Sequence, residues 1–283
     1  MSVNNEMKKI LVTGCNGQLG REIQKEYEND GAMLICTDMG DLDISDNEQV
    51  MRYVRDLQPD VIMNCAAYTA VDACENEWDL AYRINAIGPR NLAIAARETG
   101  AKLMHISTDY VFEGNAHEPY TEFDEVHPVS AYGKTKLEGE RFVQQFAERY
   151  FILRTAWLYG EGNNFAKTML RLAESHDEVR VVCDQFGSPT SAAELAKVMH
   201  RLEPTENYGL FHATCEGSCS WADFAEEIFR LAGKTTKVTR VTTEEYGSTT
   251  KRPAYSVLDN YMLRLTTGAR MADWKDALRA YLG

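Results

Sequence analysis

The chain has 283 residues, of which 44% are hydrophobic, and its formal net charge at pH 7 is -13. This length and composition are typical of one large α/β domain, or of a nucleotide-binding domain with a smaller partner. The negative charge argues against nucleic-acid binding, because contacts to a phosphate backbone need clustered Lys and Arg.

The sequence also argues against a membrane protein, a disulfide-bonded secreted protein and a metal site. No apolar run approaches the ~20 residues that span a bilayer, and the first residues lack a basic-then-apolar signal pattern. Seven scattered cysteines indicate reduced thiols, so we expect a cytoplasmic protein. Cys215 and Cys219 are close together, but no second Cys or His pair accompanies them at zinc-ligand spacing, and we predict no metal.

The first predicted strand leads into a glycine-rich turn and then an amphipathic helix. Gly14, Gly17 and Gly20 follow this strand at G-x-x-G-x-x-G spacing. Gly14 can make a tight turn, Gly17 lets the backbone approach a pyrophosphate, and Gly20 permits close contact between helix and strand. The spacing departs from the usual G-x-G-x-x-G, so by itself it does not distinguish a dinucleotide-binding loop from a structural turn.

The second predicted strand ends at Asp38, where a carboxylate can accept hydrogen bonds from an adenosine ribose diol. No Lys or Arg lies between residues 26 and 51. This favours NADH over NADPH, although a basic group from elsewhere in the fold would reverse the preference. Asp43 and Ile44 can flank an adenine; alternatively, the acidic residues of this loop cap the helix that follows.

Further strands alternate with helices along the first half of the chain. The five predicted strands are residues 9–13, 33–37, 61–65, 102–108 and 151–154. This alternation implies a parallel sheet with right-handed crossovers, so we predict an α/β fold with a Rossmann-type doubly wound parallel sheet. Asn85, within a helix predicted from about 77 to 98, is either an ordinary polar helix residue or a structural support for the active site. His105 alternates with apolar neighbours and is expected in the core.

Tyr132 and Lys136 are the main candidates for acid–base chemistry. Positions four apart on a helix lie on one face, which places the lysine ammonium beside the tyrosine hydroxyl. A fixed positive charge lowers the pKa of the phenol from ~10 towards a range useful for catalysis. The motif is short, so the alternative is an ordinary solvated helix turn. The predicted sheet, however, brings Gly14, Asp38 and Thr108 to the same carboxyl edge beside this helix.

Six blocks of sequence together resemble the extended short-chain dehydrogenase/reductase family, and within it the dTDP-4-dehydrorhamnose reductase group. The blocks are residues 14–20, 66–72, 107–112, 132–136, 154–157 and 184–190. An Arg-Pro step at 252–253 continues the likeness, so the resemblance covers essentially the whole chain. It implies that NADH or NADPH reduces the C4 ketone of a dTDP-linked 4-keto-6-deoxy sugar, with dTDP-L-rhamnose as the product.

The same resemblance assigns roles to individual residues. Thr108, Tyr132 and Lys136 match the catalytic Ser/Thr-Tyr-Lys triad, with Tyr132 as the proton donor to the ketone oxygen. The implied cofactor contacts are Gly14, Asn16, Gly17, Gln18, Leu19, Gly20, Asp38, Asp43, Ile44, Ala66, Ala67, Tyr68, Tyr132 and Lys136. The implied substrate contacts are Thr108, Asp109, Tyr110 and Trp157.

Two substrate candidates carry structural alternatives. Trp157 offers an aromatic face to a deoxy sugar or a thymine ring, but tryptophan is also a good core residue. Arg252 is either a ligand of the substrate pyrophosphate, which guanidinium groups bind in a bidentate way, or a surface arginine before a proline bend.

The C-terminal half is expected to build the substrate side. We predict a dinucleotide-binding domain at 1–158 and a smaller, mainly substrate-binding α/β lobe at 159–283. A helix near 192–202 is expected to return to the first domain. Residues 221–232 show helical apolar spacing and are expected to serve packing, and a last helix is predicted at about 271–282.

Two other functions remain compatible with the sequence. Another nucleotide-sugar reductase or an epimerase would share the triad and the glycine loop. A non-catalytic regulatory subunit would bind a dinucleotide and a partner enzyme, although the intact triad disfavours this role. A homodimer is also compatible with the resemblance.

Overall fold

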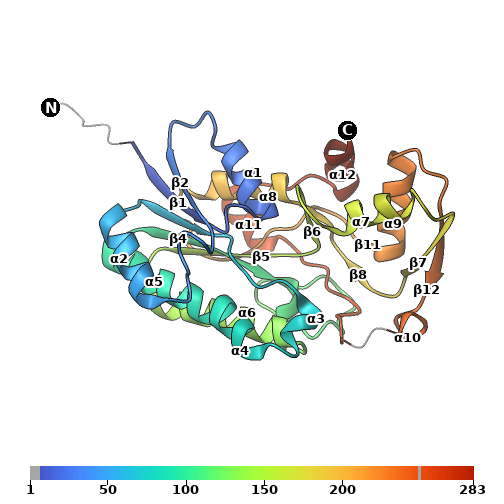
Figure 1. The fold of residues 1–283 in the computed structure, drawn as a ribbon, viewed down its shortest axis with the longest axis horizontal. Helices are drawn as coiled ribbons and strands as arrows, with labels where there is room; N and C mark the ends of the chain where they lie inside the picture. The colour runs from blue at the N-terminus through green and yellow to red at the C-terminus, as the bar shows by residue number, and fades with distance from the viewer. Residues whose placement is uncertain (1–6, 248–249) are drawn as a thin grey trace.

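The computed structural model describes residues 7–247 and 250–283, and in this part of the chain the centre is a six-stranded parallel sheet (Figure 1). Its strands are β1 (Lys9–Thr13), β2 (Met33–Thr37), β3 (Val61–Asn64), β4 (Lys102–Thr108), β5 (Tyr150–Thr155) and β10 (Gly209–His212). Their spatial order is β10-β5-β4-β3-β1-β2, so β2 lies on one side of β1 and the later strands lie on the other. The order of the strands along the sheet therefore reverses between β1 and β3. A reversal of this kind opens a crevice at the carboxyl ends of the strands, where ligands bind in such sheets.

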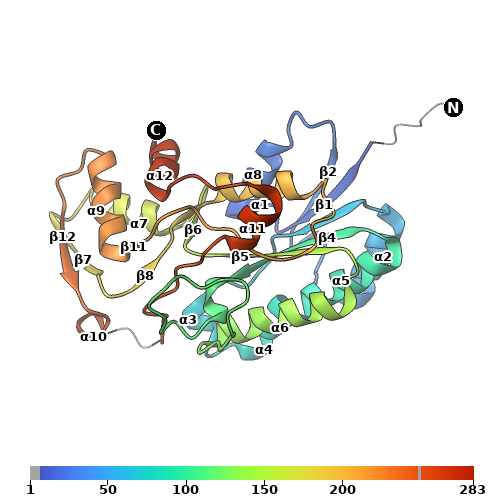
Figure 2. The ribbon, with the colours of Figure 1, turned by 180° about the vertical axis from the view of Figure 1, so that it is seen from behind.

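Helices cover both faces of the sheet, which confirms the predicted doubly wound α/β fold. In Figure 1, one layer lies below the sheet and the other above it, and Figure 2 shows the opposite side. The lower layer contains α2 (Asn47–Leu57), α5 (Gly88–Thr99) and α6 (Ala131–Phe146). The upper layer contains α1 (Gln18–Glu26), α8 (Ala192–Leu202) and α11 (Tyr261–Thr267).

The two layers bury separate hydrophobic cores because side chains alternate across each strand. On β1, Leu11 packs towards the α2 and α5 side with Val54 and Leu92. Ile10 and Val12 pack with the core on the α1 and α8 side, which extends into the C-terminal part of the chain. The N-terminal and C-terminal parts of the chain therefore share one continuous core.

The helix predicted from 77 to 98 is interrupted. It consists of α4 (Trp78–Tyr82), a π-helical turn (Arg83–Ile87) and α5, and it follows a short helix, α3 (Val71–Cys74). Pro89 lies in the first turn of α5 and has no N–H to donate to the carbonyl of Asn85. That carbonyl instead faces α6, where a Cβ on Gly139 would lie 2.2 Å from it. The wider turn thus lets the two helices approach closely.

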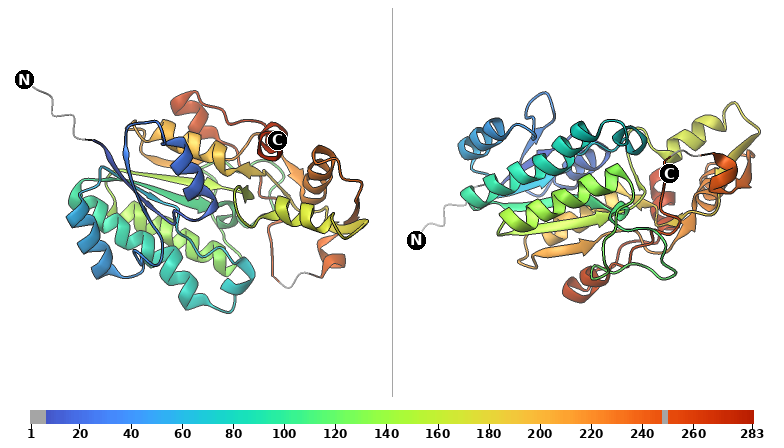
Figure 3. Two further views of the ribbon diagram at one scale, coloured as in Figure 1. Left: turned by 45° about the horizontal axis from the view of Figure 1, so that its top comes forward. Right: turned by 90° about the horizontal axis from the view of Figure 1, so that it is seen from below.

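The residues after β5 form the smaller lobe and also return to the main sheet (Figure 3). The lobe contains β6 (Leu158–Tyr159), α7 (Phe165–Leu172), β7 (Glu178–Val182), β8 (Phe186–Gly187), β9 (Thr190–Ser191), β11 (Cys219–Ser220), α9 (Trp221–Leu231), β12 (Lys237–Val241), α10 (Thr243–Tyr246) and α12 (Trp274–Leu282). Its strands form three pairs: β7 with β12, β8 with β11, and β6 with β9.

Several C-terminal elements differ from the sequence prediction or extend it. β10 is a sixth sheet strand that was not predicted, although it follows the predicted return helix α8, which packs on α1. α12 begins at Trp274, three residues later than expected, because the Asp273 side chain caps the helix by accepting a hydrogen bond from the Lys275 N–H. Within the described chain, we find no helix with both the length and the apolar character needed to cross a membrane.

Candidate active site

A pocket of about 520 Å³ lies at the carboxyl edge of the sheet and brings most of the predicted site residues together. The predicted residues among its lining are Gly17, Gln18, Leu19, Gly20, Ala67, Thr108, Asp109, Tyr110, Tyr132, Lys136, Trp157 and Arg252. Of the described residues predicted to bind the cofactor, seven are not part of this lining: Gly14, Asn16, Asp38, Asp43, Ile44, Ala66 and Tyr68. The pocket therefore joins the glycine loop to the triad, and the acidic end of β2 lies outside it.

The glycine loop has the geometry that a pyrophosphate requires. Gly14 adopts a φ of +66°, and a Cβ there would lie 2.7 Å from the Cα of Ala66. A Cβ on Gly20 would lie 2.5 Å from the Gly14 carbonyl oxygen, so the helix packs directly on the turn. α1 starts after Gly17 without a side-chain cap. Its first N–H groups are therefore free to bind an anion, assisted by the helix dipole, and the loop fits a dinucleotide.

Asp38 and Asn16 are hydrogen bonded to each other beside this loop. The Asp38 carboxylate accepts from the Asn16 N–H at 3.1 Å and from the Met39 N–H at 2.8 Å. A carboxylate held at the end of β2 is placed to accept hydrogen bonds from a ribose diol.

Asp43 and Ile44 have structural roles in their own loop. Asp43 accepts hydrogen bonds from the N–H and the hydroxyl of Ser45. The Ile44 side chain is buried in the core and would be 2.5 Å from a Cβ on Gly88. The helix cap itself is Asp46, whose side chain accepts from the N–H groups of Glu48 and Gln49.

Asn85 supports the loop that follows β3, which is the second of the two alternatives that the sequence left open. Its side chain is fully buried. It accepts from the Tyr68 N–H at 2.8 Å and donates to the Tyr68 carbonyl at 3.0 Å. The same amide donates to Thr135 on α6 at 3.2 Å. Asn85 is therefore a positioning residue between the loop after β3 and the helix that carries Tyr132 and Lys136.

The catalytic candidates converge where β4 ends and α6 begins. Ser130 caps α6 by accepting from the Gly133 N–H, and a Cβ on Gly133 would lie 2.1 Å from the Tyr110 carbonyl oxygen. This close approach holds the start of α6 against the end of β4, so Tyr132 and Thr108 line the same pocket. The Thr108 Oγ1 donates to Asp109 Oδ1 at 2.9 Å.

Lys136 is anchored to the adjacent strand. Its Nζ donates to the carbonyl oxygen of Ile106 at 2.5 Å, and its side chain is buried. Ser107 donates to Glu140, which forms a buried ion pair with Arg154 at 2.7 Å. These contacts fix the end of β4 against α6 and β5.

The structure corrects the expected effect of Lys136 on Tyr132. Burial raises the pKa of the Tyr132 phenol above its ordinary value, and the hydrogen bond with Thr108 opposes this rise only in part. Burial also lowers the pKa of Lys136 to about 8, against the attraction of Glu140. The expectation that the pKa of Tyr132 falls is therefore wrong, because desolvation is the largest influence on this phenol and raises its pKa. A neutral phenol is the form that can donate a proton.

Asp109 is a second buried acid beside the triad. Its Oδ2 has no hydrogen-bond partner among the described residues, and burial raises the pKa of the carboxyl group to about 6, although the hydroxyls of Ser256 and Thr108 lower it. Such an acceptor is placed to bind a ligand hydroxyl.

Two tryptophans also line the pocket. Trp157 adopts a φ of +47°, and its ring stacks on that of Trp221 with centroids 3.5 Å apart and planes 7° apart. Gly187 packs against the Trp157 ring, which a Cβ would approach to 2.5 Å. The stack presents a rigid aromatic surface next to the triad, suited to a sugar or a base.

Comparison with known proteins identifies the family. A model of the family described as the RmlD substrate binding domain matches residues 7–283. This chain belongs to that family.

The RmlD family member resembles several solved and curated proteins over nearly its whole length. A crystal structure of a dTDP-4-dehydrorhamnose reductase, an RfbD ortholog from Clostridium acetobutylicum, superimposes with a TM-score of 0.96 at 58% identity, covering 97% of this chain and 98% of that one. The Bacillus anthracis dTDP-4-dehydrorhamnose reductase in complex with NADP also superimposes with a TM-score of 0.96. The two chains are 45% identical, and the match covers 98% of this chain and 99% of that one. The Bacillus subtilis spore coat polysaccharide biosynthesis protein SpsK is 43% identical, over 98% of this chain and 97% of that protein.

In this RmlD family member, Arg252 lies at the pocket and is already paired. Its guanidinium donates to the Asp72 carboxylate at 2.8 and 3.0 Å, and its charge opposes the rise that burial causes in the pKa of Tyr110. Its side chain is 31% exposed, whereas that of Asp72 is 66% exposed, so the partner carboxylate can move away from it. The arginine is therefore neither a free surface residue nor an unpaired phosphate ligand.

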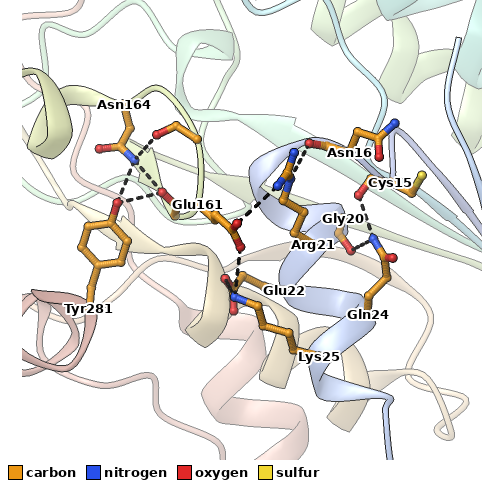
Figure 4. Close-up of polar contacts among 12 residues, drawn as sticks. Cys15, Asn16, Gly20, Arg21, Glu22, Gln24, Lys25, Glu161, Asn164 and Tyr281 are labelled. Atoms are coloured by element: carbon orange, nitrogen blue, oxygen red, sulfur yellow. Dashed lines mark hydrogen bonds and ion pairs between the residues drawn. The ribbon is translucent and has the colours of Figure 1, made fainter. Parts of the chain in front are cut away.

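Other residues of the pocket, among them Trp221, Asn163 and Asn164, were not predicted as site residues from the sequence. Trp221 was assigned to packing because it continues the apolar stripe of α9, and nothing local distinguishes it. Asn163 and Asn164 also line the pocket. The Gly/Asn-rich composition of their loop was the available signal. Asn164 caps α7 and donates to Gln18 at 3.2 Å and to the Tyr281 hydroxyl at 3.1 Å, which ties this loop to the cofactor loop and to α12 (Figure 4).

Proposed function

We propose that this chain is an NAD(P)H-dependent reductase that converts the C4 ketone of dTDP-4-dehydrorhamnose to the alcohol of dTDP-L-rhamnose. The observation that carries the proposal is that Thr108, Tyr132, Lys136 and the first turn of α1 line one pocket. Relatives named dTDP-4-dehydrorhamnose reductase, one of them solved with NADP, support the reaction and the cofactor.

The residues of the pocket supply the proton and the alignment, whereas the bound nicotinamide cofactor supplies the hydride for the ketone carbon. Tyr132 donates its phenolic proton to the ketone oxygen as negative charge develops there. Thr108 orients the phenol and holds the same oxygen. Lys136, one helical turn from Tyr132, stabilises the phenolate left after proton transfer and binds the nicotinamide ribose. The burial that raises the pKa of Tyr132 keeps it protonated before the reaction.

The remaining residues divide between cofactor and substrate. The glycine loop from Gly14 to Gly20, Asp38, and the strand end at Ala66 and Ala67 bind the dinucleotide in this proposal. Asp109, Tyr110, Trp157 and Trp221 bind the sugar or the base, and Arg252 exchanges Asp72 for the substrate pyrophosphate. Residues 1–158 then serve mainly the cofactor and residues 159–283 mainly the substrate, with α8, β10 and α11 completing the main fold.

The decisive experiment measures oxidation of NADH and of NADPH with dTDP-4-dehydrorhamnose, and with UDP- and GDP-linked 4-ketosugars as competitors. We expect turnover only with the dTDP-linked ketosugar, and dTDP-L-rhamnose as the product. Equal turnover with another nucleotide would indicate a different nucleotide-sugar reductase. A complete lack of turnover, with retained cofactor binding, would support the regulatory-subunit alternative.

We also infer a cytoplasmic location and a homodimer. The seven cysteines, all within the described residues, are free thiols, which supports a reducing compartment. Light scattering of the purified protein tests the number of subunits.

A further inference from the structure

The end of β2 places negative charge where a dinucleotide's adenosine ribose is expected. Asp38 accepts from the Asn16 N–H, and the Asp41 carboxylate accepts from the Asp38 N–H at 3.1 Å. Two carboxylates suit the 2′,3′-diol of NADH and repel the 2′-phosphate of NADPH. The related Bacillus anthracis protein has nevertheless been solved with NADP. A chain that accepts both cofactors needs a positive charge at this position.

Arg21 supplies a positive charge at the same loop. It lies on the first turns of α1, and its Nε donates to the carbonyl oxygen of Asn16 at 2.9 Å (Figure 4). Asp38 and Arg21 therefore bind the N–H and the carbonyl of one residue, so their side chains lie at most about 10 Å apart. A nucleotide bound at this loop can therefore meet both charges.

The pKa of the Cys15 thiol, in the same loop, responds to both kinds of charge. Burial raises the pKa of Cys15 most, Asp38 and Asp41 raise it further, and Arg21 lowers it.

The guanidinium of Arg21 is available for a ligand. Its ion pair with Glu161 is long, at 3.3 Å, and the two side chains are 46% and 48% exposed. Such a pair contributes little to stability. Glu161 also pairs with Lys25 at 3.3 Å and would keep that partner if Arg21 moved (Figure 4). The Glu161 carboxylate would thus stay paired with a cation when the Arg21 side chain moves to bind a phosphate.

We propose that Arg21 binds the 2′-phosphate of NADPH and sets the cofactor preference of this protein, with Asp38 binding the ribose diol of NADH. Glu161 competes with the phosphate for the guanidinium and so weakens NADPH binding. The inference rests on the proposed use of a nicotinamide dinucleotide, but it does not depend on the identity of the sugar.

Calorimetric titration without any sugar tests the proposal, with NADPH, NADH, 2′,5′-ADP and 5′-AMP as ligands. Arg21→Gln should weaken NADPH and 2′,5′-ADP binding by about 10- to 100-fold and leave NADH and 5′-AMP within about 2-fold. Arg55→Gln, which removes an exposed arginine of α2 that pairs with Glu98, is the control and should leave the ratio of NADPH to NADH affinity unchanged. Glu161→Gln should strengthen NADPH binding alone.

Retained NADH binding in the Arg21 variant shows that the loop is folded. An unchanged NADPH to NADH affinity ratio in Arg21→Gln would overturn the proposal, and so would an equal loss of both cofactors. Failure of the proposed reductase function would appear separately, as absent turnover of dTDP-4-dehydrorhamnose by a protein that still binds both cofactors.

Discussion

Asn85 Nδ2 donates a hydrogen bond of 3.2 Å to Thr135 Oγ1, and Thr135 in turn donates to the backbone carbonyl of Tyr132 at 3.0 Å. This chain of contacts connects the π-helical turn before α5 to the first turn of α6. The position of the proposed proton donor therefore depends on a buried amide that lies 47 residues earlier in the chain.

We expect Asn85→Ala to destabilise the protein by about 2–4 kcal/mol, because it leaves the N–H and the carbonyl of Tyr68 without their partner. Urea unfolding followed by circular dichroism measures this loss. Asn207→Ala, at an exposed position, should change stability by less than about 0.5 kcal/mol. Equal stability of the two variants would contradict the role assigned to Asn85.

Tyr132→Phe should lower turnover by about 100- to 10,000-fold, because it removes the phenolic proton that the proposed mechanism transfers to the ketone oxygen. Calorimetry should show that NADPH still binds, since the phenylalanine ring preserves the packing. Tyr246→Phe, at a residue that is 56% exposed, is the matched control. A steady-state rate like that of the unmodified protein would defeat the assignment of Tyr132 as proton donor.

Lys136 should make folding stability rise with pH in alkaline solution. Its pKa is about 8 in the folded protein, against an ordinary lysine pKa of 10.5, so between these values the unfolded chain holds a proton that the folded chain has lost. Stability therefore increases as the pH rises through this window, by about 3 kcal/mol for this group alone.

Unfolding in urea at pH 8 and at pH 10 measures that increase. Because other groups titrate in the same range, the comparison is between the unmodified protein and Lys136→Met, which should show a smaller increase. Lys134→Met, at an exposed position of the same helix, should show the full increase. The same increase in all three proteins would show that Lys136 does not titrate as inferred.

Gly20→Ala should weaken cofactor binding and destabilise the fold by about 1–3 kcal/mol, because the new methyl group would overlap the Gly14 carbonyl oxygen. Gly40→Ala is its control, since a Cβ there meets no described atom within 4 Å. Thermal unfolding and NADH titration of both variants test the prediction. Unchanged NADH affinity in Gly20→Ala would argue against the dinucleotide role of this loop.

Trp221→Ala should raise the KM for the nucleotide-sugar by about 10-fold, because Trp157 loses the ring on which it stacks. NADH affinity should stay the same, since the proposal assigns Trp221 to the sugar or the base and not to the cofactor. Trp78→Ala, at a residue that is 42% exposed, is the control. A change in NADH affinity without a change in this KM would refute the substrate role of Trp221.

The predicted strands and the first helix follow from local patterns in the sequence. β1 to β5 were found from short apolar runs, and the Gly14–Gly20 turn from its spacing between a strand and a helix. These features depend on neighbours a few residues apart, because backbone conformation and side-chain alternation are local properties. The fold class followed from the alternation of strands and helices, and the membership of the triad from its motif.

Tertiary structure alone decided the other features. β10 is short and became a strand by pairing with β5, and Trp221 joined the pocket only because Trp157 lies against it. The pKa of Tyr132 also depends on tertiary structure. The spacing to Lys136 predicts a lower pKa, but burial raises it. Burial and contacts between distant segments depend on how the whole chain packs, and a local pattern carries no measure of how much water that packing removes.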